Sequence, residues 1–275
     1  MQPILDIGDL AVRFGGISAL SGVSFSVMPQ QICGLIGPNG AGKTTVFNCI
    51  SRIYDPTSGS ITFNGRDLLR EKPHTIVRAG IMRSFQNLAL WPGLSVLENV
   101  MMGAYRSGKV GFVRTPLWLG ARQEEDRLAT QAFELLEELG LADVAFQPCD
   151  GLPYGTMKRI ELARGLAARP TLLILDEPAT GLTHGEVDEL AALIRQLRDR
   201  RGLSVLLVEH HMGMVMALCE HVVVLDFGRK IAEGSADDVR NDPRVIEAYL
   251  GAPEQVDLSL SDDTAEANLV EGMTS

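Results

Sequence analysis

Apolar positions along the chain fall into short continuous runs that alternate with stretches of helical spacing. The strand-length runs are VSFSVM (23–28), QICGLIG (31–37), GSITFNG (59–65), GIMRSFQ (80–86), TLLILDE (171–177), LSVLLVEH (203–210) and HVVVLDFG (221–228). Several are apolar at nearly every position, which is typical of strands buried on both faces of a sheet. Helical spacing predicts helices over Lys43–Arg52, Gln123–Leu139 and Gly185–Arg201, and one beginning after Gly155. This alternation indicates an α/β fold.

The alternation breaks in the middle of the chain and stops near its end. Residues 87–168 are mostly helical in pattern and predict a helical subdomain attached to the sheet. After Gly251 the sequence APEQVDLSLSDDTAEANLVEGMTS is acidic and poor in large apolar residues. Such a composition predicts a disordered tail over residues 252–275, because it cannot bury a core. Residues 1–251 are predicted to form the folded domain.

Composition narrows the classes of function. Hydrophobic residues make up 45% of the chain and charged residues 22%, as in ordinary globular proteins. No apolar run approaches the roughly 18 residues that span a bilayer, and the start MQPILDIGDL lacks the features of a signal peptide. We therefore expect a cytoplasmic chain that reaches a membrane only through partners.

The net charge argues against a nucleic-acid partner, and the spacing of the cysteines argues against a CxxC site. The net charge of −10 offers no basic surplus for binding a nucleic-acid backbone. The cysteines are scattered without CxxC spacing and are expected to be buried, reduced thiols: Cys33, Cys49, Cys149 and Cys219.

The segment GPNGAGKT, Gly37–Thr44, carries the strongest chemical signal. It follows an apolar strand and opens a helix, which is the setting of a loop that binds nucleotide phosphates. Its glycines let backbone N–H groups converge on phosphate oxygens. Lys43 brings a positive charge to the outer phosphates, and the Thr44 hydroxyl can bind Mg²⁺ beside the helix N-terminus. The predicted phosphate-binding residues are Gly37, Pro38, Asn39, Gly40, Ala41, Gly42, Lys43, Thr44 and Thr45.

Two carboxylates end the apolar run TLLILDEP. Neighbouring side chains on a strand point to opposite faces, so Asp176 can face Mg²⁺ while Glu177 faces a water aimed at the γ-phosphate. Hydrolysis by in-line attack needs both tasks to be done. An acidic pair alone is more often a solvated strand end, but behind a phosphate loop the functional interpretation is favoured.

Gln86 and His210 each close another apolar run. A lone glutamine is usually a surface residue, and a single histidine after a strand is weak evidence of a site. His210 and His211 are adjacent, so their rings should splay apart and not share a metal ion. Each residue gains weight only as part of an ordered set.

That set resembles the ATP-binding subunits of ABC transporters, up to about Gly251. In chain order it comprises Phe14, the phosphate loop, Gln86, LPYGTMKRIELARGLA, LLILDEP and His210. The segments FGGISALSGVSF, SFQNLALWPGLSVLENV and RNDPRVIEAYLG resemble the ATPases of branched-chain amino acid importers. The resemblance implies a P-loop NTPase core with an antiparallel β subdomain and an inserted helical subdomain, which binds ATP with Mg²⁺ and hydrolyses it.

The resemblance also implies roles for single residues. Phe14 would stack on adenine, although a core position would suit it equally. Gln86 would contact Mg²⁺ and sense the membrane subunit. Glu177 would be the general base, and His210 would hold the γ-phosphate and the attacking water. Residues 181–183 would cross a dimer interface, with Thr183 in place of the usual aspartate.

The same family carries a signature, usually Leu-Ser-Gly-Gly-Gln, at a helix start that points at the ATP of a second subunit. Here that position reads Leu152-Pro153-Tyr154-Gly155-Thr156. Proline has neither a hydroxyl nor a backbone N–H, so two potential donors to the phosphate are lost. The residues expected to contact the partner's nucleotide are Leu152, Tyr154, Gly155 and Thr156. If the partner is a different subunit with an intact serine, the site built on Lys43 and Glu177 should do most of the hydrolysis.

The implied partners are a second ATPase subunit, identical or different, two permease subunits and an extracytoplasmic solute-binding protein. They would place the chain at the cytoplasmic face of the inner membrane. The permease would dock near Gln86 and NLALWPGLSVLENV. The implied solute is a branched-chain amino acid, with urea or short amides as alternatives.

Two rival classes stay open, and a third, a GTPase, is less favoured. A soluble ABC protein acting on ribosomes or DNA typically carries two cassettes or a long coiled coil in one chain, and neither is present. A nucleotide-gated regulator without turnover would not need Glu177 and His210. A GTPase would need an Asn-Lys-x-Asp guanine reader, which this sequence lacks.

Overall fold

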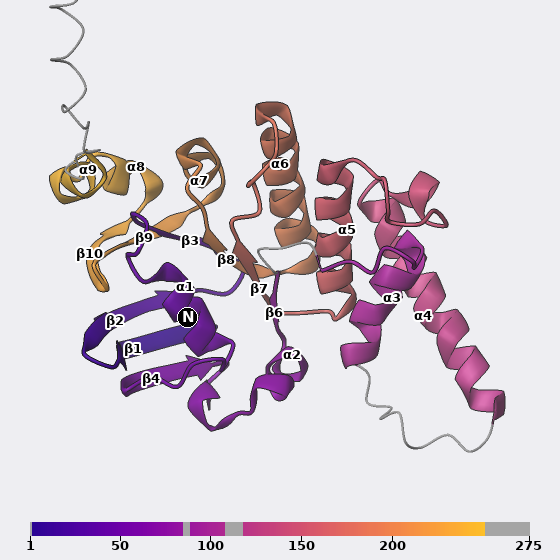
Figure 1. Ribbon diagram of the computed structural model, residues 1–275, viewed down its shortest axis with the longest axis horizontal. Coiled ribbons are helices and arrows are strands. Elements are labelled where there is room, and N and C mark those ends of the chain that lie inside the picture. Colours follow the sequence, from indigo (N-terminus) through magenta and orange to yellow (C-terminus); the bar gives the residue numbers. More distant parts are fainter. Residues whose placement is uncertain (1, 85–88, 108–117, 251–275) are drawn as a thin grey trace, which may run out of the picture.

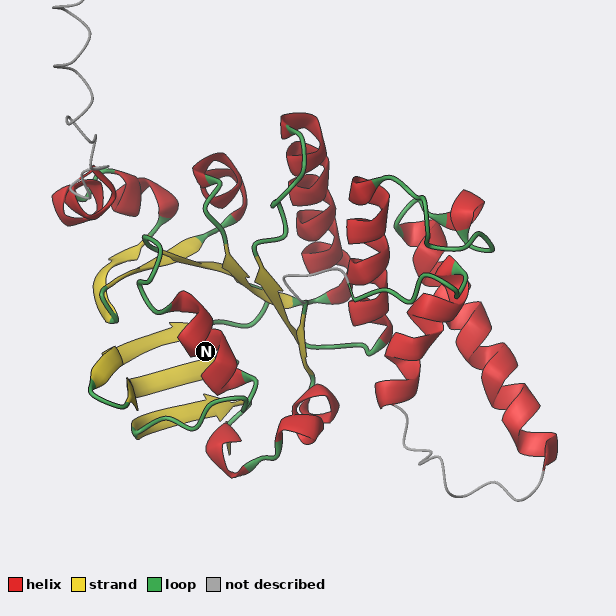
Figure 2. Cartoon of the chain, in the orientation of Figure 1, coloured by secondary structure: helices red, strands yellow, loops and turns green. Residues whose placement is uncertain are grey.

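Two β-sheets form the framework of the protein (Figure 2). The computed structural model describes residues 2–84, 89–107 and 118–250. The larger sheet has the order β10-β9-β3-β8-β7-β6, and only β10 runs antiparallel to its neighbour. Its strands are β3 (Ile32–Ile36), β6 (Ile81–Arg83), β7 (Leu172–Asp176), β8 (Ser204–Val208), β9 (His221–Asp226) and β10 (Arg229–Gly234).

The smaller sheet is antiparallel, in the order β2-β1-β4-β5. Its strands are β1 (Leu5–Phe14), β2 (Ile17–Val27), β4 (Ser58–Phe63) and β5 (Arg66–Asp67). Helix α1 (Lys43–Ile50) lies beside this sheet and directly follows β3 in the chain, after a short loop (Figure 1). The mixed sheets and the helices around them confirm the predicted fold class.

Helix α1 and the antiparallel sheet lie against one face of the larger sheet; other helices cover its second face and extend to one side of it (Figure 1). Helices α3 (Val96–Ser107), α4 (Trp118–Glu138) and α5 (Tyr154–Ala167) pack against one another within the predicted helical subdomain. The other helices are α2 (Ile76–Ala79), α6 (His184–Arg201), α7 (Met212–Leu218), α8 (Ala236–Arg240) and α9 (Pro243–Leu250). No helix in the described ranges is long and apolar enough to cross a membrane.

The larger sheet is apolar on both faces because two separate cores lie against it. In β7, Leu173 and Leu175 belong to the core shared with α5 and α6. Leu172 and Ile174, between them, belong to the core shared with α1 and the antiparallel sheet. Side chains of a strand alternate between its faces, so a strand between two cores needs apolar residues throughout. This requirement explains the continuous runs in the sequence.

The sequence pattern missed several elements. Strand β1 contains shifts in register between Ile7 and Leu10, and Asp9 there has a φ of 46°. Such a bulge interrupts the alternation that marks a strand. The pattern also missed β5, β10, α2, α7, α8 and α9, and it placed the start of α4 five residues late, at Gln123. The predicted tail, 252–275, lies outside the described residues, and the proposed division into domain and tail stays a prediction.

Candidate functional site

The carboxyl ends of four neighbouring strands meet at one edge of the larger sheet. Strands β3, β8, β7 and β6 are parallel and adjacent. The chain leaves them at the phosphate loop, at Glu209, at Glu177 and at Ser84, respectively. Loops at this edge of a parallel sheet are the usual place for a ligand. The order of the strands therefore brings the phosphate loop, Asp176, Glu177 and His210 to the same edge of the sheet.

The phosphate loop depends on glycine at its two ends. Gly37 has a φ of 147°, and a Cβ atom there would lie 2.0 Å from the carbonyl oxygen of Leu225. Gly42 precedes α1 with a φ of 103°, and a Cβ atom there would lie 2.7 Å from the side chain of Leu20. The loop is thus packed against β9 and β2, which fixes the direction of its amide groups.

Lys43 opens α1 and folds its side chain over this loop. Its Nζ donates to the carbonyl oxygens of Gly37 at 2.7 Å and Pro38 at 2.9 Å. Burial lowers the pKa of the ammonium, and the carboxylates of Glu177 and Asp176 oppose this effect. The ammonium is therefore held near the acidic strand ends, where it can turn to an incoming anion.

Asp176 ends β7 and is 2% exposed. Its Oδ2 accepts a hydrogen bond from Arg83 Nη2 at 2.7 Å. A buried carboxylate needs such a partner, because burying an unpaired charge is costly. Arg83 was missed by sequence reasoning, since only the pairing of β6 with β7 brings it to Asp176.

Glu177 and His210 form a direct pair. Glu177 Oε1 lies 2.7 Å from His210 Nε2, although the residues are 33 positions apart. Glu177 has a φ of 49°, a conformation that costs a non-glycine residue roughly 1–2 kcal/mol. Its backbone N–H donates to Val208 O at 2.9 Å, which ties it to the end of β8. A carboxylate and a histidine in contact form a pair that can take up and hold a proton.

A second residue missed by sequence reasoning, Glu209, joins the two loops that carry this pair. It is 2% exposed. Its Oε1 accepts from the N–H of Ala179 at 2.6 Å, beyond Glu177. Its Oε2 accepts from the N–H groups of His210 at 3.0 Å and His211 at 3.2 Å. One buried carboxylate thus sets the loop after β7 against the loop after β8. In the sequence, Glu209 could have been noticed as an acidic residue at the end of the apolar run LSVLLV.

Replacing Glu209 by alanine should destabilise the protein by about 3 kcal/mol, because it leaves buried N–H groups without an acceptor. Glutamine should fall between alanine and the native residue, since its single amide oxygen cannot serve both loops. Urea unfolding measures both changes. Glu189→Gln, which loses a surface ion pair with Arg159, should stay within about 0.5 kcal/mol. A loss below about 1 kcal/mol for Glu209→Ala would contradict this role.

Phe14 ends β1 and is 47% exposed. Its ring meets Tyr54 edge-on, with ring centroids 5.1 Å apart. The structure therefore places Phe14 outside the core, with about half of the residue exposed. Tyr54 is a further aromatic residue at this position that sequence reasoning did not single out.

The start of α5 lies apart from α1 in the same chain (Figure 1). Pro153 is the N-cap residue, and its carbonyl accepts from Met157 N–H at 3.0 Å. The Tyr154 ring packs over Gly181, where a Cβ atom would come within 2.9 Å of it. A Cβ atom on Gly155 would lie 2.5 Å from the Glu186 side chain. Tyr154 and Gly155 are thus packed against the loop after β7 and the first turn of α6.

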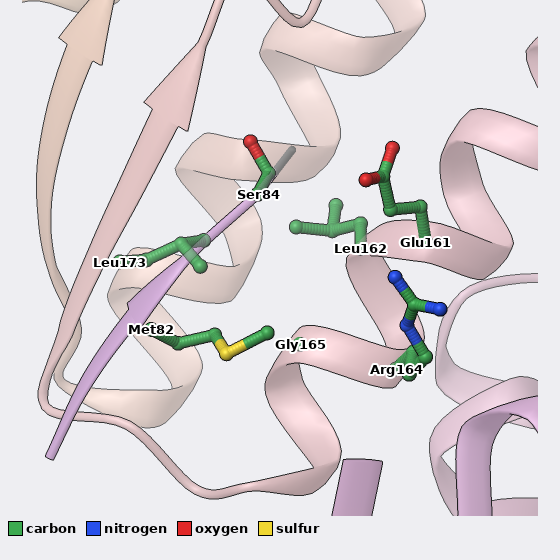
Figure 3. A pocket seen from close by; sticks show the side chains of 7 residues that line it. All are labelled: Met82, Ser84, Glu161, Leu162, Arg164, Gly165 and Leu173. Carbon is green, nitrogen blue, oxygen red and sulfur yellow. The ribbon is translucent and has the colours of Figure 1, made fainter. Parts of the chain in front are cut away.

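Helix α5 also carries charged side chains into its contact with β6. Figure 3 shows Met82 of β6 and Ser84, the residue that follows β6, facing Glu161 and Arg164 across a small cavity. Arg164 donates to Ala89 O, and its guanidinium lies 5.9 Å from the Trp91 ring centroid. Gln86 lies outside the described residues, and the contacts of Arg164 are with Ala89 and Trp91.

The possible metal ligands in the described part of the chain are oxygen atoms. Thr44 is exposed in the first turn of α1, and Asp176 ends β7. No group of three or more acidic, cysteine or histidine side chains converges there as a complete protein metal site. Magnesium commonly takes only one or two carboxylates and completes its shell with phosphate and water. The residues present fit a magnesium ion that arrives with a nucleotide.

Comparison with known proteins gives consistent matches. The ABC transporter family profile matches residues 20–180, and the profile of branched-chain amino acid ATP-binding cassette transporters matches residues 229–255. The high-affinity branched-chain amino acid transport ATP-binding protein BraF of Pseudomonas aeruginosa is 41% identical, over 91% of this chain and 98% of that protein. LivG of Escherichia coli, also described as a high-affinity branched-chain amino acid transport ATP-binding protein, is 40% identical over 91% of this chain and 98% of that protein.

A solved structure agrees with these sequences. The ADP conformation of MJ1267, an ATP-binding cassette of an ABC transporter, has a TM-score of 0.80 and 30% identity. The match covers 91% of this chain and 100% of that one.

Proposed function

The chain belongs to the ATP-binding proteins of ABC transporters, and on this premise we propose that it binds and hydrolyses ATP to drive an importer of branched-chain amino acids. One observation carries the proposal at the level of chemistry. The phosphate loop, Asp176 and the Glu177–His210 pair lie at the ends of neighbouring parallel strands. A nucleotide held by the loop would have its outer phosphate beside this pair.

In the proposed binding step, the amide groups of the loop and Lys43 hold the phosphates. Lys43 now donates to Gly37 and Pro38, and it would exchange these carbonyl oxygens for phosphate oxygens. The dipole of α1 adds to the attraction. Phe14, exposed beside Tyr54, would stack on the adenine.

In the proposed hydrolytic step, Glu177 accepts a proton from the attacking water. His210, already 2.7 Å from Glu177, orients that water and contacts the outgoing phosphate. Glu209 holds His210 through its backbone N–H, and it holds the loop that carries Glu177 through the backbone N–H of Ala179. A magnesium ion held by Thr44 and Asp176, and by Gln86 on the family resemblance, would neutralise charge on the outer phosphates.

The proposed assembly includes two ATPase subunits, two permease subunits and an extracytoplasmic solute-binding protein. It would hold this chain at the cytoplasmic face of the membrane. The exposed Trp91, which lies beside Arg164, and the exposed Met102 and Tyr105 of α3 would offer apolar side chains to the permease. Residue 152, just before α5, and residues 154–156 at its start would contact the ATP of the opposite subunit.

Transport by the assembled complex tests the proposal. We expect vesicles that contain the complex and its binding protein to take up leucine or isoleucine only with ATP inside, and solute to raise ATP turnover. Uptake of urea or acetamide in place of amino acids would contradict the solute class. ATP turnover that no permease stimulates would favour the alternative, a soluble ABC ATPase or a regulator.

A further inference from the structure

Arg83 makes a contact with the site that the proposed chemistry does not require. It is the last residue of β6, and its Nη2 lies 2.7 Å from Oδ2 of Asp176. Its Nη1 donates to Asn48 Oδ1 in α1, also at 2.7 Å. The ring of Phe47 lies beside the guanidinium, 5.4 Å from its carbon atom to the ring centroid. Arg83 is therefore bound to β7 on one side and to α1 on the other.

Asp176 is the carboxylate proposed to face magnesium, and only 3% of its side chain is exposed. Arg83 is the cation that is hydrogen-bonded to this buried charge and compensates it directly, while the Lys43 ammonium interacts with it electrostatically. When magnesium arrives with a nucleotide, two cations meet one carboxylate. The presence of the guanidinium must then weaken the hold of Asp176 on magnesium, because the like charges repel each other.

Both partners of this ion pair have other anchors. The backbone N–H of Asp176 donates to Ser84 Oγ at 3.3 Å, independently of its side chain. Asn48 and Phe47 hold the guanidinium independently of Asp176. The carboxylate can therefore turn to another cation while the backbone and Arg83 keep their places.

We propose that Arg83 is the counter-ion of Asp176 in the metal-free site and that it competes with magnesium nucleotide for this carboxylate. The inference rests on the proposed function, because it needs magnesium at Asp176. Arg83 is a positioning residue in this scheme: it neutralises the carboxylate when no metal is bound and sets how strongly magnesium is held there.

Thermal unfolding of the full chain tests the competition. Native protein and Arg83→Met are compared in EDTA alone, in ADP with EDTA, and in ADP with magnesium. Without magnesium, Arg83→Met should lower Tm by about 5 °C or more, because a buried carboxylate loses its partner. Magnesium should then raise the Tm of the ADP form by at least roughly 3 °C more in the variant than in the native protein. Arg83→Lys keeps the charge and should restore a near-native magnesium increment.

Arg52→Met is the matched control. Arg52 is also largely buried and pairs with Asp55 at 2.6 Å, but it lies two residues beyond the C-terminal end of α1, whereas the phosphate loop precedes the N-terminal end of this helix. Its loss of Tm should be the same in all three solutions. Asn48→Ala supplies a milder variant, in which Arg83 loses its alternative anchor and the magnesium increment should fall below the native value.

A magnesium increment that is equal in Arg83→Met and native protein overturns the competition. If Arg83→Met does not fold, Asn48→Ala decides instead: a magnesium increment in Tm equal to that of the native protein overturns the competition. A native chain that neither ADP nor magnesium ADP stabilises contradicts the proposed function itself, so the two failures are distinguishable.

Discussion

Glu177→Gln should reduce ATP turnover of the assembled complex at least about 100-fold, because the amide cannot accept the proton of the attacking water. Binding of ATP should persist, since the substitution keeps the size of the side chain and a hydrogen-bonding atom for His210. Phosphate release at saturating ATP measures the first effect, and binding of a fluorescent nucleotide measures the second.

The control for this variant is Glu189→Gln, which removes a carboxylate from the same part of the chain but not from the site. It should keep native turnover. A Glu177→Gln complex with more than a tenth of native turnover would show that another group acts as the base.

The same variant tests the effect of Pro153. Loss of one charge-stabilising donor at a reaction centre commonly costs ~10²–10³ in rate. In the proposed assembly Pro153 of this chain faces the nucleotide that is bound by the partner's phosphate loop. If the partner is a different subunit with an intact serine, the partner's nucleotide site is therefore the weaker one, and the site built on Lys43 and Glu177 is the stronger one. Glu177→Gln should then be more damaging than the same change in the partner's matching glutamate. If the change in the partner proved the more damaging, the predicted difference between the two sites would be contradicted, whereas the proposed chemistry at each site would not be.

Lys43→Ala should also reduce turnover at least about 100-fold, because the charge that meets the outer phosphates is lost. Among the described residues the native Nζ donates hydrogen bonds to the loop carbonyl oxygens of Gly37 and Pro38, so its removal leaves the apolar core intact and the protein should fold. Steady-state phosphate release by the complex gives the effect. Lys72→Ala, at an exposed position before a short helix, should match the native protein; turnover above a tenth of native in Lys43→Ala would contradict the role of Lys43.

The local parts of the fold were predictable because short-range rules determine them. Strands between two cores, such as β7, must be apolar throughout, and a loop as constrained as that between Gly37 and Gly42 can use little but glycine at its ends. Spacing along the chain could not predict the contact between Glu177 and His210. The family resemblance implied that both residues serve one site, and the structure brings the two side chains together.

Contacts that depend on the order of strands could not be predicted from local pattern. Arg83 reaches Asp176 because β6 is the neighbour of β7, and the two residues are 93 positions apart. Glu209 bonds Ala179 because β8 lies on the other side of β7. In the sequence each is one charged residue near an apolar run, with no sign of its partner. The bulge in β1 hid that strand for a different reason, since it breaks the period on which strand prediction relies.

Direct binding of ATP to the purified chain tests the central claim most simply. Titration calorimetry with magnesium ATP should show saturable binding of one nucleotide per chain, weakened at least tenfold in Lys43→Ala. Absence of binding to the native chain, or equal affinity of the native chain and Lys43→Ala, would contradict the claim that this loop and this lysine hold the nucleotide.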